Sequence, residues 1–138
     1  MLVSLAIALA AAIIVMTWVQ TGDQYRTLPD RVPLHMDLNG TVDLWGPRFA
    51  IWMLPAVQLA CAGIMAFAGY AISVGAANTH GSVRGVAFFA PCMLALLWRA
   101  QVLLISIAKS GEERVPMGSF WIFFAAAFGA AMLSAIFL

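Results

Sequence analysis

The chain has 138 residues, of which 64% are hydrophobic and only 9% charged, and its net charge is +1. A soluble domain carries about 25% charged residues, so this composition excludes an ordinary soluble protein. It indicates an integral membrane protein with one domain, residues 1–138. The near-neutral charge gives no clustered basic face, which excludes nucleic acid as a partner.

Four apolar runs are each long enough to cross a bilayer as a helix. They cover residues 2–19, 49–77, 85–108 and 117–138. Each is near or above the roughly 20 residues that cross ~30 Å of hydrocarbon. Barrel strands are excluded because the runs lack two-residue alternation. The first run lacks a basic flank and a good cleavage site, so we read it as a retained helix. We therefore predict an all-α membrane protein: four transmembrane helices with a structured loop between helices 1 and 2.

The polar segment between the first two runs, residues 20–48, is the most informative stretch. Its three prolines fix φ and restrict the residues before them, so it can hold a shape without helix or sheet. Asn39-Gly40 predicts a tight turn within it. Its apolar side chains are expected to rest on the bundle or on the membrane interface; they are Leu34, Met36, Leu38, Val42 and Leu44.

One motif in this segment has a fixed spacing: Leu28-Pro29, Val32-Pro33, His35, Gly40, Asp43 and Trp45-Gly46. This pattern resembles the signature of the domain of unknown function 1648, and the resemblance covers residues 1–65. That domain opens the SdpI-like immunity proteins and many small bacterial membrane proteins. The SdpI-like proteins also carry a C-terminal Gly-Ile-Arg-Thr-Pro-Trp type motif, which this chain lacks, so immunity and signalling are in doubt. The candidate loop residues are Leu28, Pro29, Pro33, His35, Asp37, Gly40, Asp43, Trp45 and Gly46.

Two arguments about orientation disagree. With four spans, the first and third loops share a side that carries five basic residues, against Arg84 on the other side. The positive-inside rule would place these five basic residues, and with them both loops, in the cytoplasm. The resemblance instead implies an extracytoplasmic first loop, with the N-terminus inside, in the bacterial cytoplasmic (inner) membrane. We follow the resemblance.

Arg99 is the second informative residue, because it lies within the third apolar run, ~14 Å below its loop end at helical rise. An ionisable group at that depth is costly and marks a candidate functional site. Either Arg99 snorkels to the interface, helped by Trp98 and Gln101, or it pairs with Asp37 or Asp43 from the first loop. Gln58 is a third candidate partner.

No catalytic centre is predicted, because no nucleophile–base pair, phosphate loop or paired carboxylates occur. His35 and Asp37 could contribute to a metal site, but they lack a recognised ligand spacing. We favour a His35 that hydrogen-bonds within the loop and orders it, with pH sensing or partner contact as the further alternative. No metal or cofactor is expected. We interpret Cys61 and Cys92 as small buried apolar side chains.

The preferred hypothesis is a non-enzymatic membrane protein that protects or senses through its Pro-rich loop. Besides the lipid bilayer, a protein or peptide is then its candidate partner. Two alternatives are left open. One is an accessory subunit of a larger membrane complex, and the other is a small carrier or channel-like oligomer centred on Arg99.

Overall fold

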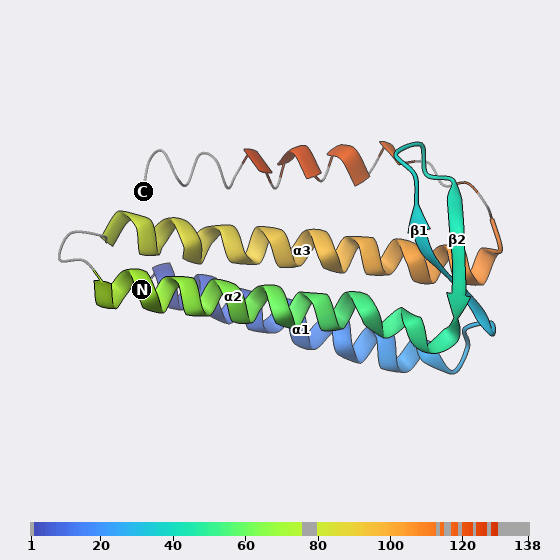
Figure 1. Ribbon diagram of the computed structural model, residues 1–138, viewed down its shortest axis with the longest axis horizontal. Coiled ribbons are helices and arrows are strands. Elements are labelled where there is room, and N and C mark those ends of the chain that lie inside the picture. The colour runs from blue at the N-terminus through green and yellow to red at the C-terminus, as the bar shows by residue number, and fades with distance from the viewer. Residues whose placement is uncertain are drawn as a thin grey trace.

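Three helices run side by side and form the body of the protein (Figure 1). The computed structural model describes residues 2–75, 80–112, 114, 117, 118, 120–122, 124–126, 128 and 129. The helices are α1 (Leu2–Tyr25), α2 (Met53–Gly75) and α3 (His80–Ser110). Both α1 and α2 pack mainly on α3 and only little on each other. Three stretches are long and apolar enough to cross a membrane: Val3–Tyr25, Arg48–Val74 and Phe89–Ser110.

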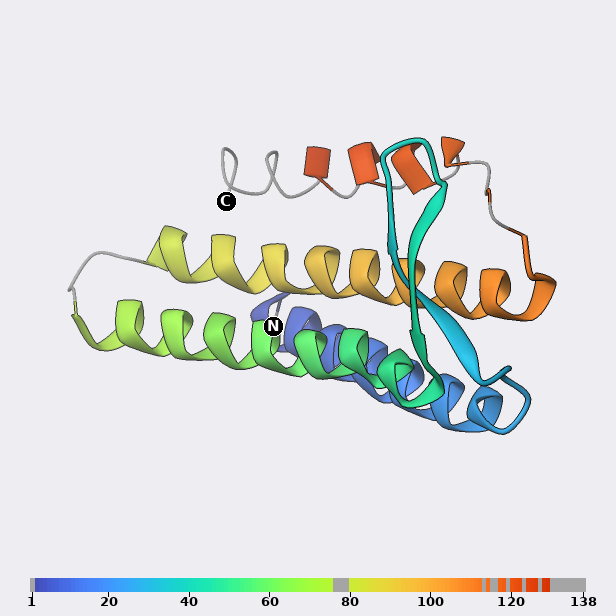
Figure 2. The same ribbon diagram turned by 45° about the vertical axis from the view of Figure 1, so that its right-hand side comes forward.

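Much of the fourth predicted span, residues 117–138, lies outside the described residues. Those described from Gly118 to Gly129 are helical. They run along α3 on the side away from α1 and α2, as Figures 1 and 2 both show. Three predicted spans are thus confirmed as helices of membrane-spanning length, whereas the fourth stays a prediction.

The helices end at residues with a clear reason to stop them. α1 continues past the predicted end at residue 19 to Tyr25. The apolar run predicts only the part of the helix that lies in the hydrocarbon layer, and a helix can extend beyond that layer. The chain then reaches Pro29, and a residue before proline avoids helical backbone. α3 ends at Ser110. The next residue, Gly111, has a left-handed φ of 68°, and its N–H donates to the carbonyl of Ile107 at 2.9 Å. That is a common helix C-terminal cap.

The segment between α1 and α2 forms a β-hairpin. The predicted structured segment is therefore present in a mostly helical chain, but the all-α class did not include this two-stranded sheet. Strands β1 (Arg31–Met36) and β2 (Val42–Pro47) pair antiparallel. A 3-10 helix, η1 (Arg48–Trp52), then leads into α2. Each strand of a two-stranded sheet has one unpaired edge, and this tolerates the prolines inside both strands.

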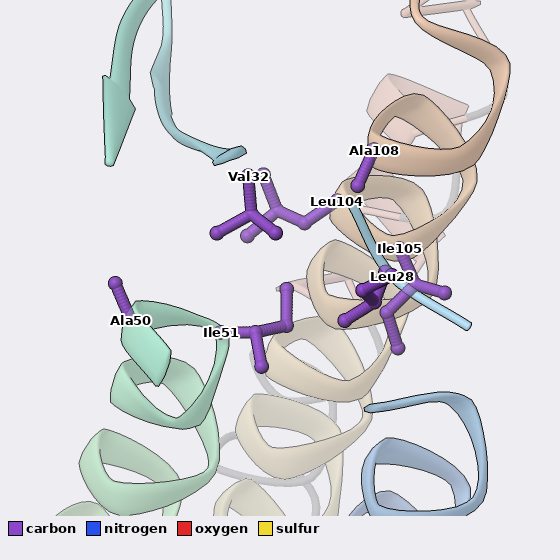
Figure 3. Packing of buried hydrophobic residues seen from close by; sticks show 7 residues of the cluster. All are labelled: Leu28, Val32, Ala50, Ile51, Leu104, Ile105 and Ala108. Carbon is purple, nitrogen blue, oxygen red and sulfur yellow. The ribbon is translucent and has the colours of Figure 1, made fainter. Parts of the chain in front are cut away.

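The hairpin lies across one end of the bundle and is held there by a buried apolar cluster (Figure 3). Val32 from β1 and Ile51 from η1 meet the last turns of α3 in this cluster. Its members are Leu28, Val32, Ala50, Ile51, Leu104, Ile105 and Ala108. Because the cluster joins the hairpin, η1 and α3, the hairpin is a docked part of the fold and not a flexible linker.

The apolar side chains of the hairpin divide into two groups. Val42 is buried, and Leu34 and Met36 pack against the apolar cluster, as expected. Leu38 and Leu44 are instead 77% and 54% exposed. These two leucines do not rest on the bundle, and their contact with the membrane interface stays a prediction.

Candidate functional site

The hairpin turn is built around Asp37. Its carboxylate accepts hydrogen bonds from the backbone N–H groups of Asn39, at 2.9 Å, and Thr41, at 2.7 Å. The Gly40 N–H donates to the Asp37 carbonyl at 3.0 Å, and Gly40 has a φ of 82° that favours glycine. The predicted Asn39-Gly40 turn is confirmed, and Asp37 has a clear structural role within it.

The pKa of Asp37 lies below its ordinary value of 3.8, chiefly because the Thr41 N–H stabilises the charged carboxylate. A depressed folded-state pKa stabilises the protein above the unfolded value and loses that contribution as pH falls through the folded value. We therefore expect the turn to loosen only below about pH 4. Backbone amide exchange at Asn39 and Thr41, corrected for intrinsic rates, should show the loss. Asp37→Ala should have lost this protection already at pH 7.

Arg48 closes the base of the hairpin. Its Nη2 lies 2.6 Å from Oδ1 of Asp30, and its Nε donates to the Pro29 carbonyl at 3.2 Å. Its backbone N–H also donates to the Asp30 carbonyl at 2.9 Å. Asp30 is almost fully exposed, so the ion pair itself adds little stability. The three contacts together fix where the chain enters and leaves the hairpin. We call residues 28–48 the hairpin cap.

His35 and Asp43 face each other on the outer side of the hairpin cap. The Nδ1 of His35 lies 2.7 Å from Oδ1 of Asp43, and both side chains are more than half exposed. The strand pairing is irregular on both sides of His35, and such irregularities re-aim side chains and occur often beside functional sites. The expected hydrogen bond of His35 within the loop is therefore confirmed. Among the described residues, no three His, Cys, Asp or Glu side chains come together to hold a metal.

Gly46 has a packing reason to be glycine. An added Cβ would lie 2.8 Å from Cγ of Leu34 on the opposite strand, closer than such contacts allow. Leu34 packs in turn against the buried cluster. Gly46 therefore leaves the room that Leu34 needs to pack against the cluster.

Directly below the hairpin cap, Gln101 of α3 joins three elements. Its Nε2 donates to Oγ1 of Thr21 on α1, at 3.0 Å, and to the carbonyl of Ile51 on η1, at 3.1 Å. Gln101 and Thr21 are both buried. We call this arrangement the Gln101 joint. Gln101 is thus not directed to the interface as an aid to snorkelling, which corrects that expectation.

The other intramembrane polar residues lie nearby on α2 and α3. Gln58 is fully buried, and its Nε2 donates to the carbonyl of Leu94 at 3.0 Å. Arg99 is half-buried, two residues before Gln101. The contacts described above for Asp37 and Asp43 lie within the hairpin cap. Pairing of Arg99 with either aspartate stays a prediction.

The sequence analysis did not single out several polar residues that hydrogen-bond at this end of the bundle. Thr17 and Thr21 lie four apart on α1, where each hydroxyl donates to the carbonyl one turn earlier at 2.8 Å. Their spacing on an apolar helix was a readable signal of a polar stripe. Trp98 donates to Gln20 at 2.9 Å, and no sequence signal marks that pair.

The first and third loops meet at this end of the molecule. Thr41, at the hairpin tip, forms an isolated antiparallel bridge with Arg114. Lys109, at the end of α3, hydrogen-bonds Gln24, at the end of α1. The prediction that these two loops share one side is confirmed for the described residues.

Fold and hairpin cap together define an integral membrane protein, with three described apolar helices covered at one end by a β-hairpin. Residues 5–59 match the model of the family described as Domain of unknown function (DUF1648). This confirms the resemblance over α1, the hairpin cap and the start of α2. No curated protein and no solved structure gives a significant match to the chain.

Proposed function

We propose that this chain is a non-enzymatic membrane protein whose hairpin cap binds a protein or peptide partner, in a protective or sensing role. The observation that supports this is a docked hairpin that presents exposed apolar and ionisable side chains away from the bundle. Leu38 and Leu44 are exposed beside the His35–Asp43 pair. A contiguous exposed apolar patch commonly marks an interaction site, and the proposal takes Leu38 and Leu44 as part of one.

The proposal places the hairpin cap on the extracytoplasmic face of the bacterial cytoplasmic membrane. Three of the five basic residues at this end, which argue for the cytoplasm by number, have local structural partners. Arg48 pairs with Asp30, Lys109 hydrogen-bonds Gln24, and the charge of Arg114 helps to lower the pKa of Asp37. Basic residues needed for folding are weaker indicators of orientation. We therefore give the number of basic residues less weight than the orientation that the family resemblance implies.

Photo-crosslinking in intact bacterial cells tests both parts of the proposal. A photoreactive residue at Leu44 should give a discrete adduct of one recurring added mass, and His35→Ala should weaken it. A photoreactive residue at Ile64 is the matched control, because Ile64 is a similarly exposed apolar residue on α2. A cysteine at Asn39, in a chain lacking both native cysteines, should react with a membrane-impermeant reagent added outside.

Two outcomes would contradict the proposal. A Leu44 adduct no stronger than that at Ile64, or one unchanged by His35→Ala, would mean that the hairpin cap is not a recognition surface. Labelling of Asn39 only after the membrane is opened would reverse the orientation. The accessory-subunit and carrier hypotheses remain alternatives. Lipid contact already accounts for the exposed apolar side chains of α1 and α2.

A further inference from the structure

The exposed side chains of α1 change from apolar to polar within one turn. From Leu5 to Val19 they are all apolar, and Trp18 is among the last of them. The next exposed residues are Gly22, Asp23, Arg26 and Thr27. A charged side chain in hydrocarbon is costly, whereas an exposed apolar side chain is at ease there. On α1, the surface suited to hydrocarbon therefore ends between Val19 and Asp23.

The same change occurs on the other two helices. From Phe49 to Phe67, the exposed residues of η1 and α2 are apolar or glycine. On α3 the pattern after Gln101 is the reverse, because the apolar residues between Leu103 and Ala108 are all buried. The exposed residues there are Ser106, Lys109 and Ser110. An apolar interior with a polar surface is the arrangement of proteins in water, so the end of α3 has a surface suited to water.

Hydrogen bonds place these three changes at one level of the bundle. Gln101 of α3 binds Thr21 of α1 and the carbonyl of Ile51 on η1 in the Gln101 joint. Thr21 lies between the last exposed apolar residue of α1 and its first exposed charge, and Ile51 follows Phe49 by two positions. The surface therefore changes polarity in one plane across the bundle. We call the plane of the Gln101 joint the boundary level.

Aromatic side chains gather at the boundary level. The ring centroids of Trp18 and Trp52 lie 5.3 Å apart, and that of Tyr25 lies 5.9 Å from Trp52. Trp98 of α3 donates to Gln20 of α1 close by. Trp and Tyr are enriched where hydrocarbon meets lipid headgroups, because each joins an apolar ring to a polar N–H or O–H. The residue types at this level therefore fit the headgroup layer of one leaflet.

The length of each helix below the boundary level matches one hydrocarbon layer. From that level to the far ends, α1 runs ~28 Å, α2 ~33 Å and α3 ~32 Å at helical rise, and the hydrocarbon core is ~30 Å thick. On the other side, α3 continues from Gln101 to Ser110, another ~14 Å. The hairpin cap packs on this continuation and not on the lower part of the bundle (Figure 1).

Hydropathy alone would put the edge of the membrane elsewhere. The apolar stretch of α3 extends to Ser110, but its apolar residues Leu104, Ile105 and Ala108 are buried in the cluster under the hairpin cap. They therefore do not need lipid around them. An edge at Ser110 would also leave the exposed Asp23 and Arg26 within hydrocarbon, which is costly.

We propose that the boundary level, through Trp18 and Trp52, binds the lipid headgroup layer of the leaflet on the side of the hairpin cap. The hairpin cap and the end of α3 then stand outside the hydrocarbon as a water-facing unit with its own buried core. Arg99 lies ~3 Å from the boundary level along α3, so its charge is near the headgroups and not at the membrane centre. The carrier hypothesis loses the deep charge on which it depends. This inference is independent of the partner proposed for the hairpin cap.

Spin labelling of single cysteines tests the boundary level. The full chain, with both native cysteines replaced by alanine, is reconstituted in vesicles of phosphatidylcholine and phosphatidylglycerol. Collisions of each nitroxide with oxygen, which concentrates in hydrocarbon, are compared with collisions with a water-soluble nickel chelate. Val15, Val19 and Asp23 are exposed and lie one turn apart on one face of α1. Their cysteine variants should favour oxygen, show an intermediate preference and favour nickel, in that order.

The decisive position is on α3, where Ser106→Cys should favour nickel although it lies within the apolar stretch. Val57→Cys on α2 is the matched control below the boundary level; Val57 is exposed, and its label should favour oxygen. A preference for oxygen at Ser106→Cys would overturn the proposal, because the end of α3 would then be in the membrane. A label at Val19→Cys that favours oxygen as strongly as one at Val15→Cys would remove the headgroup layer from Trp18, and nickel preference at Val57→Cys would place the edge deeper in the bundle.

Discussion

Ile51→Ala is expected to destabilise the protein by about 2–5 kcal/mol, the usual range for truncating a fully buried isoleucine. Ile51 is only 2% exposed, and it belongs to the cluster that joins η1, β1 and α3 (Figure 3). The cavity left behind would remove support from Val32 and Leu104 together. Titration with SDS in mixed micelles measures the free energy of unfolding. Amide exchange across β1 should also accelerate, because the hairpin cap loses contact with the bundle.

Ile64→Ala is the matched control. The same atoms are removed from α2, but Ile64 is 69% exposed, so the loss should stay below about 1 kcal/mol. Exchange across β1 should not change in this control. Equal losses at positions 51 and 64 would show that the hairpin cap is not held by the buried cluster.

The parts of the fold that could be predicted are those that depend on local composition. A run of apolar residues is sufficient to predict a helix of membrane-spanning length, and Asn39-Gly40 is sufficient to predict a turn. The strands were missed because each contains a proline, which argues against a hydrogen-bonded ladder. A hairpin signal was nevertheless present, since Val32, Leu34 and Met36 alternate with other residues just before the Asn39-Gly40 turn. The docking of the hairpin against α3 is the part that no local pattern encodes.

The same distinction applies to the candidate site. His35 and Asp43 are eight residues apart, and the motif marked both before their contact was known. Gln101 was marked only as a polar residue in an apolar run. Its partners lie 80 and 50 residues away in the chain, so its role depends on how the three elements meet. A polar residue in a span can be flagged from sequence, but its partner needs the tertiary structure.

Gln101→Leu is expected to cost about 1–3 kcal/mol, because it removes both donated hydrogen bonds and leaves two buried acceptors without that donor. The loss is limited by two features of the Gln101 joint. Thr21 keeps the hydrogen bond that its own hydroxyl donates to Thr17. The Oε1 of Gln101 is buried without a partner among the described residues, and its removal is favourable. Polar contacts within membranes also average below about 1 kcal/mol.

A double-mutant cycle separates the joint from general packing. Thr21→Val keeps the side-chain shape but removes the acceptor, so Thr21→Val with Gln101→Leu should lose less than the sum of the two single changes. Ser106→Ala is the control, because it removes an exposed hydroxyl from the same helix and should change stability by less than about 0.5 kcal/mol. Strict additivity in the cycle would mean that the contact between α1 and α3 through Gln101 contributes nothing. Gln101 would then act through its hydrogen bond to the Ile51 carbonyl on η1 alone.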